Sequence, residues 1–245
     1  MEEIYDANAE YYDTITRERV AGLHHVVADF ATQIERDGAP VLDIGAGTGR
    51  LTVHLARLIA PCEVIAIEPT RSLRAILASR IADDDQLATQ VTIIPRTLDV
   101  AIEMLPAQIG GAIAFGVLPH LGPLQRQQLL QLLADRMAPG GRALVEVMPP
   151  WTTDPVPMSP VADTTIGRHR IECFMQAQPV GSDQLRWKMT YRRTDERGLA
   201  VHEASADSVC WVTTPDAFEL DARRCGLQLQ WPAAELAMLT RGTKS

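Results

Sequence analysis

Short apolar segments alternate with helical patterns through residues 41–147, and this alternation limits the fold more than any other feature of the sequence. Five apolar segments typical of strands lie at residues 41–44, 64–67, 91–94, 112–115 and 143–147. Apolar residues recur with helical spacing in three of the intervals between them, over residues 51–58, 72–81 and 123–137. Strands that are apolar throughout and are joined by helices form a parallel sheet with helices on both faces. The sequence therefore predicts a doubly wound α/β fold.

The segments on either side of this region extend the fold. Residues 1–38 have an amphipathic helical pattern that ends at Asp37-Gly38, so we expect an N-terminal helical lid before a core at residues 39–148. Thr214 and Pro215 are suited to the N-cap and the first turn of a later helix. Two short apolar segments follow, and with them the main sheet would have seven strands, mostly parallel. Residues 214–245 would then complete a single domain of 245 residues.

The sequence changes character after Pro149-Pro150. A proline-rich stretch at residues 155–160 is typical of a loop, and three segments typical of longer strands follow it. From Leu185 to Tyr191 apolar residues alternate with polar ones, which predicts a sheet with one face against an apolar partner. We therefore expect an added antiparallel sheet within residues 151–213, either as a roof over a binding site or as a contact between subunits. The three predicted strands are residues 165–176, 184–194 and 199–212.

Composition and charge exclude several classes of protein. The chain has 46% hydrophobic and 22% charged residues, which is ordinary for a globular protein and argues against disorder. Its net charge is −8 and its basic residues form no cluster larger than a pair, so we expect no nucleic-acid partner. Glycines and prolines interrupt the longest uncharged stretch, so we expect no membrane-spanning helix. The acidic start of the chain does not resemble a signal peptide, and we expect a cytoplasmic protein.

Metal binding is not expected either. The four cysteines are far apart in the sequence and form no Cys-x-x-Cys pair, so we expect buried free thiols. Asp83, Asp84 and Asp85 form an acidic run, but this run follows a helical pattern and is typical of a solvated helix end.

A glycine-rich turn follows the first apolar segment. Asp43 precedes Gly45, Gly47 and Gly49, which lie at alternate positions. Glycines after a parallel strand let the backbone approach a ligand at the sheet edge, with a helix N-terminus behind them. The spacing differs from the Gly-x-Gly-x-x-Gly pattern of dinucleotide-binding proteins, because the sixth position from Gly45 is Arg50. The Asp43 carboxylate would repel a pyrophosphate and suits a cationic ligand, although Asp43 could also only cap the following helix.

This turn resembles motif I of the class I S-adenosylmethionine-dependent methyltransferases, within their small-molecule branch. Glu68 ends the second apolar segment, where the resemblance implies a carboxylate that binds both ribose hydroxyls of the cofactor. The implied cofactor is S-adenosyl-L-methionine, and the implied product is S-adenosyl-L-homocysteine. The residues implied to bind it are Tyr12, Asp43, Gly45, Gly47, Gly49, Glu68, Pro69, Thr97, Leu98, Asp99 and Phe115.

Three further segments carry the resemblance. The segment Thr97-Leu98-Asp99 resembles the adenine-contacting loop, although Asp99 could equally cap a helix over residues 100–105. Residues 115–121 resemble the loop after the fourth strand. The pairs Tyr5-Asp6 and Tyr12-Asp13 resemble Tyr-Asp elements that precede motif I. The resemblance implies that the Tyr12 hydroxyl holds the amino-acid end of the cofactor, whereas the simpler reading is packing within an N-terminal helix.

His120 is the candidate catalytic residue. It lies in the loop at the active edge of the sheet, five residues after Phe115, and is better placed for acid–base chemistry than the other histidines. It could act as a general base on a hydroxyl acceptor, or it could only form a hydrogen bond to the acceptor.

The resemblance implies methyl transfer to nitrogen or oxygen of a small-molecule acceptor, most plausibly in a biosynthetic pathway. Transfer from a sulfonium depends mainly on alignment and on exclusion of water. A second interpretation is N-methylation of a peptide or protein amine, attracted by the acidic surface. A third is a non-catalytic partner subunit that keeps the fold, although the intact glycine turn and Glu68 argue against it. The added sheet makes a homodimer possible.

Overall fold

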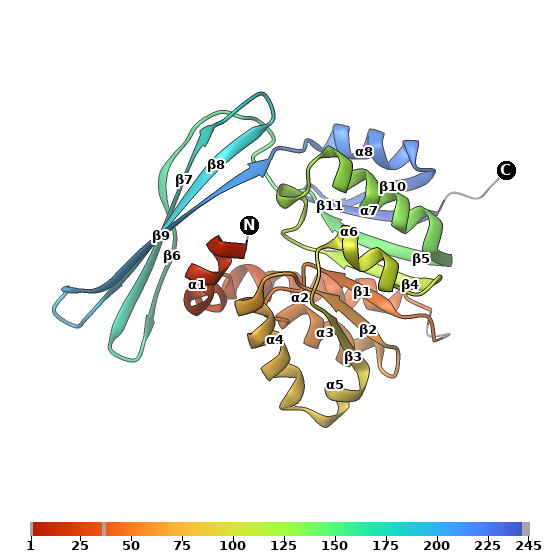
Figure 1. Ribbon diagram of the computed structural model, residues 1–245, viewed down its shortest axis with the longest axis horizontal. Coiled ribbons are helices and arrows are strands. Elements are labelled where there is room, and N and C mark those ends of the chain that lie inside the picture. The colour runs from red at the N-terminus through yellow and green to blue at the C-terminus, as the bar shows by residue number, and fades with distance from the viewer. Residues whose placement is uncertain (1, 36–37, 242–245) are drawn as a thin grey trace.

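The computed structural model describes residues 2–35 and 38–241, and its largest element is a sheet of seven strands (Figure 1). The strand order is β10-β11-β5-β4-β1-β2-β3. Strands β1 to β5 pair in parallel, whereas β11 is antiparallel to β5 and to β10. The predicted doubly wound, mostly parallel sheet is therefore confirmed. The strands are β1 Val41–Ile44, β2 Val64–Ile67, β3 Val91–Ile94, β4 Ile109–Ala114, β5 Met137–Glu146, β10 Leu227–Ala233 and β11 Leu236–Arg241.

The central strands face two different hydrophobic cores, which explains why they are apolar without alternation. On β1, Leu42 and Ile44 pack with α6, α7 and α8, whereas Val41 packs with α2, α3, α4 and α5 on the other face. Burial of apolar surface on both faces holds the three layers together. The helices are α2 Arg17–Thr32, α3 Arg50–Ile59, α4 Arg71–Ala82, α5 Asp85–Gln90, α6 Leu98–Ala101, α7 Pro123–Arg136 and α8 Pro215–Arg224, with a short 3₁₀ turn η1 at Ile102–Met104.

A separate antiparallel sheet is inserted between β5 and α8, in the order β6-β7-β8-β9. It stands beside the core rather than extending the seven-stranded sheet (Figure 1). The expectation of an added antiparallel sheet is confirmed. Its strands are β6 Val156–Ile166, β7 His169–Pro179, β8 Gln184–Thr194 and β9 Ala200–Trp211.

Two details predicted for this sheet are wrong. The proline-rich stretch predicted as a loop belongs to β6, and the segment predicted as one strand at residues 165–176 is divided by a turn at Gly167-Arg168. Because β6 is an edge strand, Pro157 and Pro160 do not interrupt a central ladder of hydrogen bonds. The pairing of β6 with β7 also shifts its register twice near these prolines. Gly167 has a φ of 58°, a conformation that favours glycine, and this allows the tight turn.

The N-terminal lid consists of two helices, α1 Glu2–Ile15 and α2, where the sequence predicted one continuous helical segment. The predicted end of the lid is Asp37-Gly38, and Asp37 lies outside the described residues. Near the C-terminus, Thr214 caps α8 as predicted, because its hydroxyl oxygen accepts a hydrogen bond from the Ala217 N–H at 3.1 Å.

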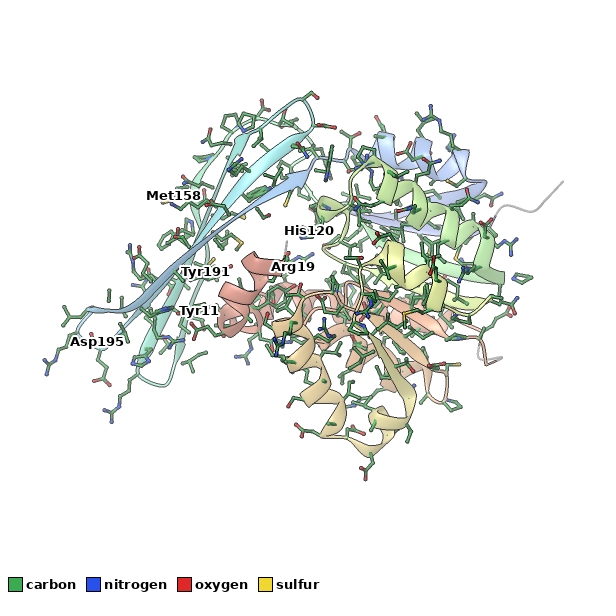
Figure 2. All side chains as sticks on the ribbon, in the orientation of Figure 1. Tyr11, Arg19, His120, Met158, Tyr191 and Asp195 are labelled. Atoms are coloured by element: carbon green, nitrogen blue, oxygen red, sulfur yellow. The ribbon has the colours of Figure 1, made fainter. Side chains whose placement is uncertain are left out.

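Helix α1 is the apolar partner that the alternating pattern of β8 requires. Tyr11 is fully buried and stacks on Tyr191, with ring centroids 5.2 Å apart (Figure 2). Ile171 and Cys173 of β7 complete this small core. The Tyr11 hydroxyl also forms a hydrogen bond of 2.5 Å with His202 Nδ1. The inserted sheet is thus fastened to the lid helix through one buried aromatic ring.

Neither metal nor membrane features stand out in the ranges that the structure describes. No group of three His, Cys, Asp or Glu side chains in these ranges is arranged to hold a metal ion. Asp84 instead caps α5, accepting hydrogen bonds from the N–H groups of Gln86 and Leu87. Within the same residues, no helix is both long enough and apolar enough to cross a membrane.

Tyr11→Ala should lower the free energy of unfolding by about 3–5 kcal/mol, because it removes a fully buried ring from between α1 and the inserted sheet. Tyr11→Phe keeps the stacked ring and removes only the hydrogen bond to His202, so its loss should be about 1 kcal/mol. Urea denaturation followed by tryptophan fluorescence measures both values. Equal losses in the two variants would show that the ring itself does not hold α1 on the sheet.

Candidate active site

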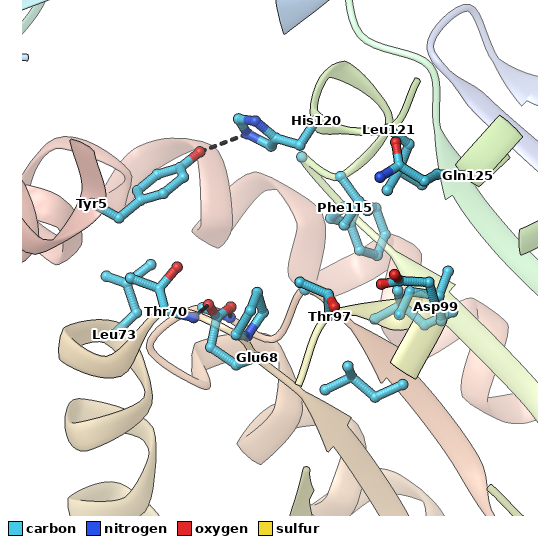
Figure 3. A pocket seen from close by; sticks show the side chains of 18 of the residues that line it. Tyr5, Glu68, Thr70, Leu73, Thr97, Asp99, Phe115, His120, Leu121 and Gln125 are labelled. Carbon is cyan, nitrogen blue, oxygen red and sulfur yellow. Dashed lines mark hydrogen bonds between the residues drawn. The ribbon is translucent and has the colours of Figure 1, made fainter. Parts of the chain in front are cut away.

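A cavity opens at the carboxyl ends of β1, β2 and β4, with α1 and the short 3₁₀ turn η2 (Leu118–His120) contributing to its wall (Figure 3). Its volume is about 850 Å³ including the open mouth. This is the edge of a doubly wound sheet at which ligands bind, next to the point where the strand order reverses. The predicted site residues that line it are Tyr12, Gly45, Gly47, Glu68, Pro69, Thr97, Leu98, Asp99, Phe115 and His120.

The three glycines of the turn have different local reasons for lacking a side chain. All three have positive φ angles, between 57° and 82°. A Cβ on Gly45 would lie 2.5 Å from Val117 Cγ2, and one on Gly49 would lie 2.3 Å from Leu77 Cδ1, so both positions are closed by packing. A Cβ on Gly47 would lie 3.6 Å from the Tyr12 hydroxyl, in ordinary contact across the cavity. The backbone of Gly47 is therefore exposed to the cavity. Gly49 is the N-cap of α3 and lets α3 pack closely against α4.

Glu68 is the acidic residue that the cavity brings against the glycine turn. Its side chain is buried, with Oε2 accepting a hydrogen bond from the Gly47 N–H and Oε1 accepting one from the Thr70 N–H, both at 2.7 Å. Burial raises the pKa of Glu68, and the two backbone N–H groups oppose that shift. Each carboxylate oxygen can accept a further hydrogen bond, so Glu68 can bind two neighbouring hydroxyls of a ligand.

Asp43 lies behind the turn, outside the cavity lining. Its Oδ2 accepts a hydrogen bond of 2.6 Å from the Thr52 hydroxyl of α3, and its side chain is buried. Burial raises the pKa of Asp43 from 3.8 to about 7, against the opposing effect of the Thr52 hydrogen bond. It does not act as the N-cap of α3, which is Gly49. A contact between Asp43 and the cofactor stays a prediction.

Tyr5 and His120 form a hydrogen bond across the mouth of the cavity (Figure 3). The Tyr5 hydroxyl lies 2.7 Å from His120 Nε2, and the ring of Tyr5 meets the ring of Tyr12 edge-on at 5.9 Å. Burial lowers the pKa of His120 from 6.5 to about 4, so the imidazole is neutral at pH 7. His120 Nδ1 is buried without a hydrogen-bond partner among the described residues. In the sequence, Tyr5 stands out only as part of a Tyr-Asp element. Its contact with His120 could not be predicted, because the two residues are 115 positions apart.

The loop after β3 contributes the opposite wall of the cavity. Helix α6 begins at Leu98, with Thr97 at the N-cap position and Asp99 in the first turn. The alternative that Asp99 caps a helix over residues 100–105 is therefore wrong, because the helix begins before Asp99. Gln125 and Gln128 of α7 also line the cavity, and no sequence pattern marked them.

An ion pair between one buried and one exposed side chain lies next to the cavity at the end of β5. Glu146 is buried, accepts a hydrogen bond of 2.7 Å from the Gly116 N–H, and pairs with the guanidinium of the exposed Arg19 of α2, which Figure 2 labels. Gly116 lines the cavity, so this pair fixes part of its wall. Sequence reasoning missed it because Arg19 and Glu146 belong to patterns typical of a helix face and a strand end.

The comparisons with known proteins agree with this geometry. Residues 42–143 match the family model described as "Methyltransferase domain". No match is found among curated proteins. This match agrees with the resemblance predicted from the glycine turn and Glu68. Similar structures include ones complexed with S-adenosylmethionine or S-adenosylhomocysteine, which agrees with the predicted cofactor.

Three solved structures illustrate the likeness. DesVI from Streptomyces venezuelae superimposes with a TM-score of 0.76 at 14% identity, covering 96% of this chain and 98% of its own. CalS10, an amino pentose methyltransferase of Micromonospora echinaspora solved with S-adenosylmethionine bound, has a TM-score of 0.71 at 19% identity, covering 94% and 96%. The sugar N-methyltransferase KedS8 from Streptoalloteichus has a TM-score of 0.67 at 15% identity, covering 95% and 93%. At these identities the likeness shows the fold.

Asp43 should make the protein less stable as the pH rises from about 4 to 7. Its pKa is 3.8 in the unfolded chain and about 7 in the folded protein, so folding holds a proton that the unfolded chain releases in this range. The stabilisation is complete below pH 3.8 and is lost as the pH passes about 7. Each unit of difference between the two pKa values corresponds to about 1.4 kcal/mol. Urea denaturation at several pH values, compared between the wild type and Asp43→Asn, measures this contribution.

Asp84→Asn is the matched control. Its hydrogen bond to Arg57 lowers the pKa of Asp84, so the contribution of this carboxyl is lost as the pH falls, the opposite direction. A difference between wild type and Asp43→Asn that stays constant across the range would mean that Asp43 is charged in the folded protein.

Proposed function

We propose that the chain transfers a methyl group from S-adenosylmethionine to a nitrogen of a small biosynthetic molecule. The observation that carries this proposal is the position of the buried Glu68 carboxylate, bonded to the bare Gly47 backbone inside the cavity. A carboxylate with free acceptor positions beside an exposed glycine backbone suits a ligand that has paired hydroxyls and a cationic group. S-adenosylmethionine has both of these features.

The residues that line the cavity fit this cofactor along its whole length. Glu68 would bind the ribose hydroxyls, and the backbone of Gly45 and Gly47 with the Tyr12 hydroxyl would hold the amino-acid end. The adenine would lie against Pro69, Phe115 and the segment from Thr97 to Asp99.

The state of His120 favours nitrogen over oxygen as the acceptor. Bound in this cavity, S-adenosylmethionine supplies a methyl group on a positively charged sulfur, which a neutral amine accepts without a base. A hydroxyl acceptor needs a base, and an imidazole with a pKa of about 4 is a poor one at neutral pH. His120 and Tyr5 would therefore orient the amine through hydrogen bonds, and α1 would exclude water. The structural neighbour KedS8 is a sugar N-methyltransferase, which agrees with an amine acceptor.

The inserted sheet serves in this proposal as a roof on the acceptor side. Tyr11 holds the sheet on α1. Strand β9 ends beside the cavity at Trp211, whose ring lies 3.3 Å from the position that a Cβ on Gly122 would take. The outward face of β7 and β8 carries ion pairs such as Arg170–Asp163 and Arg192–Glu203. A homodimer through this sheet stays a prediction from the sequence.

Two other functions remain as alternatives. One is N-methylation of a peptide or protein amine. A non-catalytic partner subunit has no physical need for a buried Glu68 or an orienting Tyr5–His120 pair.

The purified protein should bind S-adenosylmethionine and should release S-adenosylhomocysteine in the presence of some amines. Isothermal calorimetry measures the binding, and a panel of matched amino and hydroxy compounds, amino sugars included, measures the release. Turnover with hydroxy compounds alone would contradict the preference for nitrogen. No heat at millimolar cofactor would contradict the whole proposal.

A variant of Glu68 tests how the cofactor is bound. Glu68→Ala should weaken cofactor binding by about 1–3 kcal/mol, because it leaves two bound hydroxyls without a charged acceptor. Thr92→Val is a matched control, since it removes an exposed side-chain hydrogen bond on β3 outside the cavity and should leave the affinity unchanged.

His120→Ala should raise the Michaelis constant of the amine and lower kcat less than about tenfold, because an orienting group mainly affects binding. In the wild type, the plot of rate against pH should show no acidic limb from His120 near pH 6.5, since the pKa of His120 is about 4. Steady-state kinetics across pH measures both effects. A loss of about 10² to 10⁴ in kcat would instead identify His120 as a general base.

A further inference from the structure

The end of α1 is bound to the glycine turn by one acidic side chain. Asp13 Oδ1 accepts a hydrogen bond of 2.5 Å from the hydroxyl of Thr48, the residue between Gly47 and Gly49. Asp13 Oδ2 pairs with the Arg80 guanidinium of α4. Arg80 also donates from Nε to the Thr48 carbonyl at 2.9 Å. Asp13, Thr48 and Arg80 thus form a closed set of contacts, which we term the Asp13 clamp.

The backbone around Asp13 is held as well. The last carbonyl groups of a helix have few partners within it, and side chains donate hydrogen bonds to two of those in α1. The Thr16 hydroxyl donates to the Tyr12 carbonyl at 2.7 Å, and Arg50 donates to the Asp13 carbonyl at 3.2 Å. The α1 terminus is therefore fixed both to its own turn and to the start of α3.

The clamp sets the place of Tyr12 over the cavity. Tyr12 and Asp13 are neighbours in the chain, as are Gly47 and Thr48. The Asp13–Thr48 bond therefore brings the Tyr12 hydroxyl to 3.6 Å from the position of a Cβ on Gly47. The ring of Tyr12 also meets the ring of Tyr5 edge-on at 5.9 Å, so this packing and the backbone register together place the Tyr12 hydroxyl.

We propose that Asp13 is a positioning residue for cofactor binding, which acts by holding Tyr12 against the glycine turn. This inference rests on the proposed function, because it assumes that the cofactor occupies the cavity. When the amino-acid end of the cofactor contacts both Tyr12 and the turn, the clamp keeps the two walls at the correct separation. The role differs from that of an ordinary exposed ion pair, which contributes little, because Thr48 is buried and is gripped on both its hydroxyl and its carbonyl.

A double-mutant cycle on cofactor affinity tests the proposal. Asp13→Ala and Tyr12→Phe should each raise the dissociation constant of S-adenosylhomocysteine about tenfold, as expected when a partly buried, charge-assisted hydrogen bond is lost. The double variant should bind no more weakly than the weaker single variant, because both changes remove the same contact. Calorimetry gives the dissociation constants, and thermal melting of each variant verifies folding.

Thr48→Val is the second variant of the clamp, with nearly unchanged side-chain volume, and it replaces Asp13→Ala if that variant does not fold. It should show the same lack of additivity with Tyr12→Phe. Arg57→Gln is the matched control, since it breaks an ion pair of α3 with Asp84, away from the cavity, and should leave the affinity unchanged.

The outcomes separate the inference from the proposed function. Additive losses, or a Tyr12→Phe variant that binds as well as the wild type, would overturn the positioning role of Asp13. A wild-type protein that binds no S-adenosylhomocysteine would instead overturn the proposed function.

Discussion

The structure depends on a backbone that reverses direction between β1 and α3 without side chains in the way. Gly45, Gly47 and Gly49 all have positive φ angles within five residues, a conformation that other residues adopt only with strain. Because this turn is compact, α3 packs back on the sheet, α4 approaches within contact of Gly49, and the Gly47 N–H reaches Glu68. The cavity, the lid contacts and the two cores are all built around that reversal.

In and around the cavity, burial shifts the pKa values of the ionisable side chains more than ion pairs do. Asp43 and His120 are shifted in opposite directions, and both shifts favour the neutral form. Glu68 has backbone N–H groups that oppose its shift, so it is the carboxylate best supported in its charged form. Under the proposed function, such an environment would hold a cationic ligand next to one acceptor group and leave the reacting groups neutral, which suits catalysis by alignment.

Sequence patterns over a few residues predicted the strands and the turn whose form depends on those residues alone. The apolar strands β1 to β3 were identified at their observed bounds, and β1 and β2 are buried at every residue, as strands covered on both faces are. Gly45, Gly47 and Glu68 were placed at the cavity from their spacing. Strand β6 was missed, because proline is compatible with an edge strand and a sequence does not reveal which strand is at the edge. The Tyr5–His120 bond and the Arg19–Glu146 pair join distant segments, and no local pattern encodes such contacts.

The contact between α1 and the inserted sheet also has a consequence for biosynthesis. Tyr11 and its partner His202 are separated by 191 residues, so α1 is synthesised long before its partner strand β9. Domains fold largely in the order in which they emerge, and contacts this distant in sequence form late. The core around β1 can assemble earlier, and the ring of Tyr11 on α1 stays exposed until β9 has been made. Docking of α1 on the inserted sheet therefore follows the synthesis of β9, and truncated products that lack β9 leave Tyr11 without its partner His202.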